Sequence, residues 1–265
     1  LFAIIVIACL FWFRMAQTET TLNDRLGGLF FFPVFWAFSS MFSAMYAFPA
    51  EKAVLNKDRA SGAYRLSAYY VAKTLVETPA DCIYPTIFSL IVYWVVGFNP
   101  GGGPFIVFLI ILTAVVLTSQ SFGLAISAAL LDVRRAQVLA SCLILSSMLM
   151  AGYYINNENI PGFVRPLRYL SYLKYSYEAL VRNEVLGQVY PCVADGLAHT
   201  VYSQNGIKCP VRGPDVLVGA KLDHSLSVIG NLGILLVWNV LVRLFGYLAL
   251  TYLNINHKPR KNLKN

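Results

Sequence analysis

Charged residues are scarce in this 265-residue chain: 13% of its residues are Asp, Glu, Lys or Arg, whereas a typical soluble domain has about 25%. Apolar residues make up 57%. A chain with so little charge has too little polar surface to cover a water-exposed globule. This excludes an ordinary soluble enzyme, a disordered regulator and a disulfide-stapled secreted mini-domain. The composition indicates a multi-pass membrane protein.

Residue types that carry enzymatic chemistry are also few. The three histidines, His199, His224 and His257, are scattered and lack the spacing of metal ligands. Asp223-His224-Ser225 places triad residue types side by side, but a catalytic triad needs a spatial arrangement that adjacency does not provide. No Gly-Lys dipeptide occurs, so the chain has no phosphate-binding P-loop. The sequence therefore predicts no catalytic residue, no metal site and no nucleotide hydrolysis by this chain itself.

Long uncharged runs predict an all-α membrane protein. Crossing a hydrocarbon core of ~30 Å takes roughly 20 helical residues. We expect five full spans, near residues 29–49, 80–98, 105–131, 136–155 and 226–253. Leu1–Phe13 is apolar but too short to span, so we interpret it as the end of a first helix that begins outside this sequence. Together these six helices form one domain over residues 1–255, followed by a basic tail at 256–265.

The basic residues predict the orientation of these helices. If the first helix runs from the cytosol outward, segment 50–79, the turn at 132–135 and the tail are cytosolic and hold 11 Lys and Arg residues. The two short outer loops hold only Arg14 and Arg25. Segment 156–225 then lies outside the cell. The net charge of +8 thus reflects membrane topology rather than nucleic-acid binding.

The placement of the cysteines agrees with this orientation. Cys9, Cys82 and Cys142 lie in apolar runs, where a free thiol acts as a small hydrophobic group. Cys192 and Cys209 lie in segment 156–225, on the side where disulfides form. We predict a disulfide between these two; the alternative is two independent free thiols.

Two segments between the spans are distinctive. Residues 49–64 (PAEKAVLNKDRASGAY) are charged and mostly helix-forming, and we expect a helix along the inner membrane surface. It is either a simple connector or a lever by which a cytosolic partner moves the adjacent helices. Residues 151–187 contain GYYINNENIP, then RYLSYLKYSYEAL and NEVLG. Their tyrosines and helical apolar spacing are typical of a segment at, or re-entering, the outer membrane interface.

Together these segments resemble the ABC-2 type membrane domain of G-subfamily ("White"-type) ABC half-transporters. The family's connecting helix, Glu-Arg/Lys…Glu/Asp-Arg-x-x-Gly-x-Tyr, has its counterpart in residues 51–64. Its outer run, from Gly-Tyr/Leu-x-x-Asn to Asn-Glu-Phe-x-Gly, has its counterpart in residues 152–187. The chain departs mildly, with Lys52 where Arg is common, Asp58 where Glu is common and Val185 where Phe is common. The resemblance covers essentially all 265 residues.

The resemblance implies an ATP-driven exporter of the plasma membrane. It would work as a homo- or heterodimer and move an amphipathic or lipid-like substrate out of the cytosol or inner leaflet by alternating access. ATP and Mg²⁺ would bind in a nucleotide-binding domain that is absent from this chain and in the family precedes the first membrane helix. The residues expected to couple to that domain are Glu51, Lys52, Asp58, Arg59 and Tyr64, with Arg134 and Arg135 as a second contact.

The resemblance also places a substrate cavity between the second and fifth helices of both protomers. Two stripes at helical spacing are candidates for its lining. The first contains Phe32, Phe35, Trp36, Ser39 and Phe42; the second contains Ser141, Leu145, Met148, Leu149 and Gly152. Aromatic rings and methionine are typical of a binding site for a planar, hydrophobic or amphipathic molecule. The alternative is that both stripes pack against lipid or neighbouring helices.

Tyr153 and Tyr154 fall where the family has its bulky upper gate. Their alternative role is interfacial anchoring. Three other classes of protein compete with the exporter: an ATP-independent secondary transporter or channel, an integral-membrane enzyme, and an ABC-type permease without a fused ATPase. Scarce intramembrane acids and histidines, and the lack of a clear repeat, count against the first two. The long outer loop with two cysteines fits the third poorly.

Overall fold

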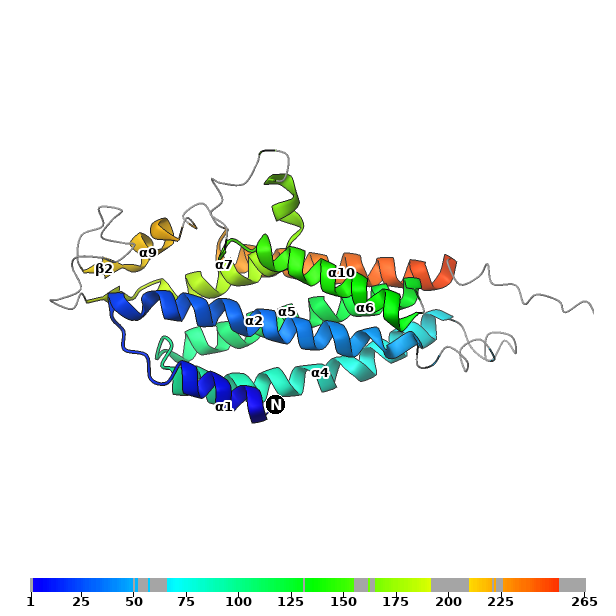
Figure 1. Ribbon diagram of the computed structural model, residues 1–265, viewed down its shortest axis with the longest axis horizontal. Helices are drawn as coiled ribbons and strands as arrows, with labels where there is room; N and C mark the ends of the chain where they lie inside the picture. Colours follow the sequence, from blue (N-terminus) through cyan, green and yellow to red (C-terminus); the bar gives the residue numbers. More distant parts are fainter. Residues whose placement is uncertain are drawn as a thin grey trace, which may run out of the picture.

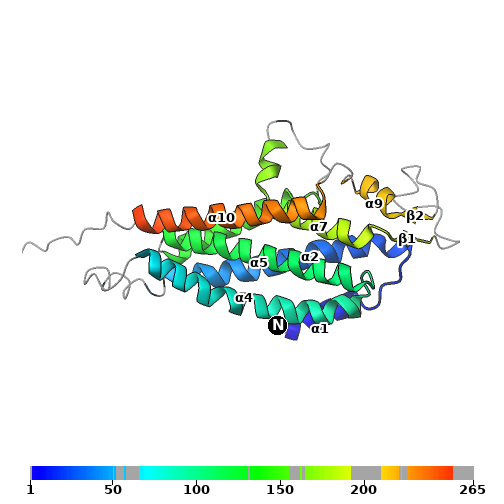
Figure 2. The same ribbon diagram turned by 180° about the vertical axis from the view of Figure 1, so that it is seen from behind.

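The computed structural model describes residues 2–49, 51, 57, 66–130, 132–154, 162, 165–191, 210–220, 222 and 226–252. These residues form a bundle of helices that run roughly side by side along its long axis (Figures 1 and 2). The main helices are α1 (Phe2–Phe11), α2 (Leu22–Met45), α4 (Leu66–Val96), α5 (Gly102–Leu130), α6 (Val133–Leu149), α7 (Tyr172–Val185) and α10 (Val228–Tyr252). Helix α5 is central, since it contacts α2, α4, α6, α7 and α10.

Four of the described helical segments are long and apolar enough to cross a membrane: Glu19–Pro49, Ser67–Val96, Gly102–Leu130 and Val228–Tyr252. They overlap four of the predicted spans, which confirms a mostly helical membrane domain. Helix α1 has ten residues and α6 has 17, both fewer than the roughly 20 that a crossing requires. The count of six membrane helices therefore stays a prediction.

Helix α4 begins at Leu66, well before the predicted span at 80–98. Residues 66–79 carry two charges, Lys73 and Glu77, and these pair with each other at 3.2 Å one helical turn apart. Pairing lowers the cost of placing both charges near the hydrocarbon. The second half of the segment expected to be cytosolic is therefore part of the long helix.

Helix α6 is shorter than the predicted span at 136–155. Asp132 caps its beginning by accepting hydrogen bonds from the backbone nitrogens of Arg134 (3.0 Å) and Arg135 (3.4 Å), which satisfies donors that would otherwise have no partner. The helix ends at Leu149, and Gly152 follows with a φ of 93°. That left-handed conformation favours glycine and prevents the helix from continuing.

Helix α7 is buried within the bundle and contacts α2, α5, α6 and α10. Ser171 joins it to α6, because its hydroxyl accepts from the Lys174 backbone nitrogen (3.3 Å) and donates to the Ser147 carbonyl (2.7 Å). The burial includes charged side chains: Glu178 lies 3.6 Å from Lys174 and 3.5 Å from Arg168. Internal ion pairs thus allow a tyrosine-rich, charged helix to pack on nearly all sides.

Short elements gather at the end of the bundle that holds the beginning of α2. They are η1 (Glu19–Thr21), β1 (Val189–Tyr190), β2 (Val211–Arg212) and α9 (Gly213–Gly219). A further short helix, η3 (Arg165–Leu170), precedes α7 and contacts it. Strands β1 and β2 pair antiparallel, Val189 with Arg212 and Tyr190 with Val211. At the opposite end, Figure 1 shows the end of α2, the beginnings of α4 and α6 and the end of α10. The helix ends that flank the segments predicted to be cytosolic therefore lie at one end of the bundle.

Candidate functional site

The aromatic stripe of α2 faces α4 at two of its positions. Phe32 is fully buried, and its ring packs edge-on against Phe88 of α4 at a centroid distance of 5.3 Å. Trp36 contacts the same ring at 5.6 Å. These two residues belong to the packing between α2 and α4 in the single chain.

The other members of the stripe lie nearer the surface. A cavity of about 260 Å³ is lined by Ile4, Phe35, Trp36, Ser39 and Tyr84. The buried Nε1 of Trp36 has no hydrogen-bond partner within the part of the chain that the structure describes. Phe42 is half-buried and stacks on Phe38 at 4.7 Å. The structure thus brings three predicted cavity residues together, with α1 and α4 as neighbours.

The stripe on α6 is largely open. Leu145 and Leu149 are each 48% exposed, whereas Ser141 and Met148 are intermediate. The Ser141 hydroxyl donates to the Gln137 carbonyl of its own helix (2.9 Å). Helix α6 contacts α2, so both stripes lie on adjacent helices, but none of the described residues that line the 260 Å³ cavity belongs to α6.

The predicted gate tyrosines belong to an aromatic cluster of Phe30, Tyr153, Tyr154 and Tyr177. Tyr153 stacks on Phe30 at 4.7 Å and 14°, and Tyr154 meets the same ring edge-on at 5.3 Å. Tyr177 of α7 contacts both Phe30 and Tyr153. Tyr153 is 39% exposed and Tyr154 is 58% exposed. The tyrosines therefore join α2, the end of α6 and α7.

One predicted coupling residue, Glu51, makes defined contacts. Its Oε1 lies 2.6 Å from Lys73 Nζ of α4, and its Oε2 accepts a hydrogen bond from the Tyr69 hydroxyl. These two hydrogen bonds, first that from Lys73, hold the pKa of Glu51 below its usual value. Glu51 therefore fixes the chain that follows α2 to the beginning of α4.

Arg134 and Arg135 are exposed in the first turn of α6, at the end of the bundle that also holds the beginning of α4 (Figure 1). The structure therefore places this pair and Glu51 at one end. Several predicted site residues lie outside the described residues: Lys52, Asp58, Arg59 and Tyr64 of the coupling segment, and Cys192 and Cys209.

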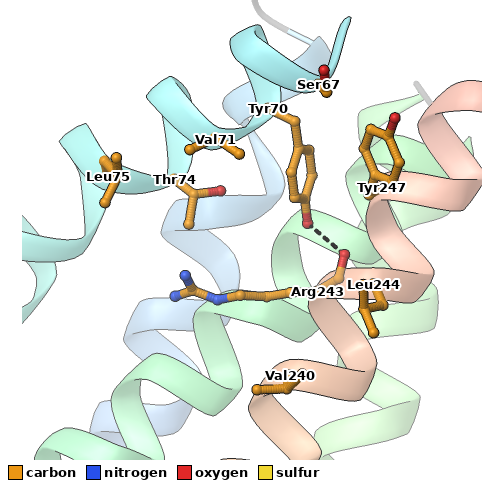
Figure 3. Close-up of a pocket in the computed structure, with 9 residues that line it drawn as sticks. All are labelled: Ser67, Tyr70, Val71, Thr74, Leu75, Val240, Arg243, Leu244 and Tyr247. Atoms are coloured by element: carbon orange, nitrogen blue, oxygen red, sulfur yellow. Dashed lines mark hydrogen bonds between the residues drawn. The ribbon is translucent and has the colours of Figure 1, made fainter.

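Arg243, the one charge within the apolar run of α10, belongs to a polar cluster inside the bundle whose other members were not predicted from the sequence. Arg243 of α10 donates from Nε to the Ser121 hydroxyl (3.0 Å) and from Nη2 to Gln120 Oε1 (3.3 Å). Asn239 donates to the same serine at 3.1 Å. Figure 3 shows the Arg243 side chain reaching from α10 toward α4. Two sequence features could have indicated this cluster: Ser-Gln-Ser at residues 119–121 within an apolar run, and Asn239 one helical turn before Arg243. Polar groups at membrane depth usually carry a function.

Comparisons with known proteins identify the family. Residues 1–185 match the family model described as ABC-2 type transporter. The chain is 40% identical over 230 residues to ABC transporter G family member 21 of Arabidopsis thaliana, an alignment that covers 86% of this chain and 32% of the relative.

Two further relatives agree. ABC transporter G family member 22 of Arabidopsis thaliana is 32% identical over 95% of this chain and 29% of its own length. ABC transporter G family member 1 of Dictyostelium discoideum is 25% identical over 96% of this chain and 31% of its own length. The chain thus spans about a third of the length of these relatives. It belongs to the ABC-2 type transporter family, as an integral membrane domain of the G type.

Proposed function

We propose that this chain is the permease of an ATP-driven exporter, which moves an amphipathic or lipid-like molecule out of the cytosol or inner leaflet at the plasma membrane. Membership of the ABC-2 family carries this proposal. In it, six membrane helices per chain and a second protomer enclose the path. ATP and Mg²⁺ bind to a nucleotide-binding domain outside this chain and supply the free energy, while the chain binds substrate and changes conformation.

The surface of α2 and α6 supports a substrate path that two copies complete. Ser39, Leu145 and Leu149 are exposed on adjacent helices, so a second protomer placed against them would close a slot with apolar walls and a hydroxyl. Trp36 Nε1, which has no hydrogen-bond partner among the described residues, lies beside the 260 Å³ cavity and offers a donor to a polar group of the substrate. Apolar walls with few polar groups are typical of small-molecule sites.

The exposed charges of Arg134 and Arg135, at the end of the bundle that also holds Glu51, support a role of this end in coupling to the nucleotide-binding domain. We expect Arg134→Glu/Arg135→Glu to lower substrate-stimulated ATPase activity and export by about tenfold, since coupling energies of 1–3 kcal/mol correspond to roughly 5–150-fold. Both side chains are exposed, so the fold should persist. The measurement is ATPase activity and vesicular export of the complete protein in proteoliposomes, with basal ATPase activity recorded separately.

Arg14→Glu is the matched control, because Arg14 is also exposed and lies in the connection between α1 and α2, at the opposite end. It should leave both activities within about twofold of wild type, since exposed charges contribute little on their own. Equal losses in the two variants would contradict coupling through α6. Export driven by an ion gradient without ATP would contradict the exporter as a whole.

The strand register supports the predicted disulfide. Strand β1 ends at Tyr190, which pairs with Val211 at the beginning of β2; Cys192 follows Tyr190 by two residues and Cys209 precedes Val211 by two. We expect non-reducing peptide mapping to find a linked peptide containing both cysteines. Cys192→Ser should lower stability by about 3 kcal/mol, as for loops of this length. Recovery of both residues as free thiols from oxidising conditions would contradict this prediction.

A further inference from the structure

A groove between α4 and α10 lies apart from the α2 and α6 stripes. Its volume is about 480 Å³, and its lining residues are Ser67, Tyr70, Val71, Thr74, Leu75, Val240, Arg243, Leu244 and Tyr247 (Figure 3). The rim is open, because Val71, Leu75, Val240 and Leu244 are each more than half exposed. Pockets that hold small molecules have volumes of roughly 300–1,000 Å³. Since both helices are candidate membrane spans, the groove opens toward lipid.

The position of Arg243 gives the depth of the groove. Arg243 precedes the end of α10 at Tyr252 by nine residues, about 14 Å at 1.5 Å per residue. The hydroxyl of Tyr70, one turn into α4, donates to the Arg243 carbonyl (3.0 Å). The groove therefore lies in the half of the bundle nearest Glu51, within reach of a lipid chain from that leaflet.

Two polar side chains of the groove could bind a ligand: among the described residues, Thr74 lacks a hydrogen-bond partner and Arg243 lacks a counter-charge. Thr74 is 6% exposed, and its Oγ1 has no hydrogen-bond partner in the described part of the chain. Figure 3 shows this hydroxyl pointing from α4 toward α10, with the Arg243 side chain below it. Arg243 donates to a serine and an amide but forms no ion pair with any acidic residue that the structure describes. An unpaired cation at membrane depth is costly.

The acidic groups near the groove do not supply this counter-charge. Glu77 of α4 and Glu51, which precedes α4, both pair with Lys73, at 3.2 Å and 2.6 Å. Asp81, the other acidic residue of α4, interacts with the Gln120 side chain, and among the residues that the structure describes it forms no ion pair with Arg243. A neutral hydroxyl entering the groove would satisfy Thr74 but leave the guanidinium charge uncompensated. A carboxylate has two acceptor oxygens, one for the Thr74 hydroxyl and one for Arg243, and forms the stronger, charge-assisted hydrogen bonds.

We propose that the groove between α4 and α10 binds a single-chain membrane amphiphile with a carboxylate head, of the long-chain fatty acid class. The head lies between Thr74 and Arg243, and the chain lies along the apolar rim. This site is distinct from the proposed transport path and requires neither ATP nor export. Binding at the groove and failure of transport can therefore be observed independently.

The experiment uses the complete protein in phosphatidylcholine nanodiscs and a palmitic acid that carries a photoactivatable diazirine and an alkyne. Labelled peptides should map to α4 and α10. Unlabelled palmitate should compete at least tenfold better than methyl palmitate, which has the same chain without the charge. Arg243→Gln should remove this preference, and Thr74→Val should weaken palmitate binding about tenfold, the effect of one hydrogen bond to a charged group.

A rim variant tests the site without touching the polar cluster. Leu244→Trp fills the groove and should reduce labelling at least tenfold. Leu241→Trp is its control, since both leucines are 54% exposed on the same helix but Leu241 does not line the groove; its labelling should match wild type. Equal labelling of the two tryptophan variants would overturn the proposal. Equal competition by palmitate and methyl palmitate against the photoactivatable probe would also overturn it, as would stronger competition by phosphatidic acid than by palmitate. Disulfide cross-linking of Val71→Cys between two copies of the chain would overturn it too, because a second protomer would then cover the groove.

Discussion

Replacing Glu184 by glutamine is expected to lower the free energy of unfolding by about 3–5 kcal/mol, because it leaves the Arg25 guanidinium buried without a counter-charge. Arg25 Nη1 lies 2.8 Å from Glu184 Oε1, and the two side chains are 1% and 3% exposed. Arg25 Nη2 also donates to the carbonyls of Met15 (2.6 Å) and Gly97 (2.8 Å). One pair therefore holds α2, α7, the α1–α2 connection and the α4–α5 turn together.

The measurement is unfolding of the complete protein in mixed micelles by a titration with sodium dodecyl sulfate. Arg135→Gln is the control: Arg135 lies 3.7 Å from Asp132, and the two side chains are 80% and 50% exposed, so its loss should cost about 0–1 kcal/mol. Arg25→Met/Glu184→Met should be more stable than Glu184→Gln, since no unpaired charge stays buried. A cost below about 1 kcal/mol for Glu184→Gln would show that the pair does not hold this end together.

Gly123→Ala is expected to destabilise the bundle by about 3 kcal/mol, at the upper end of the usual range for overpacking. A Cβ atom at Gly123 would lie 2.4 Å from the Met41 carbonyl oxygen and 2.9 Å from the Ala44 Cβ. Both atoms belong to α2, which is too regular to yield at one residue. The two helices would have to separate, which would also strain the hydrogen bond from Ser40 to the Val116 carbonyl (3.0 Å).

Gly233→Ala in α10 is the matched control. No atom lies within 4 Å of a Cβ at Gly233, so this change should be neutral or stabilising by up to about 1 kcal/mol, the helix preference of alanine over glycine. The same detergent titration compares the two variants. Equal stability of Gly123→Ala and Gly233→Ala would mean that α2 does not pack against Gly123 of α5 as closely as its neighbours Met41 and Ala44 indicate.

The sequence predicted the site unevenly, and the differences have physical causes. Helical spacing predicts that Phe35, Trp36 and Ser39 share one face, because an α-helix repeats every 3.6 residues, and all three line the same cavity. Spacing does not state which neighbouring helix a face meets, so the packing of Phe32 against Phe88 of α4 was not foreseen. The Gln120–Arg243 contact joins residues far apart in the chain, and hydropathy carries no information on such pairs.

Composition and hydropathy determined the class of this protein, since a chain so poor in charge can bury its apolar runs only as helices in lipid. The motifs at residues 51–64 and 152–187 identified the family. The tertiary structure determined which charged side chains are buried and which partners they have. By sequence, Arg25 counts as an outer-loop residue, yet it is fully buried against Glu184. Whether a charge meets water, lipid or a counter-charge depends on contacts between distant segments, and only the packed bundle specifies those.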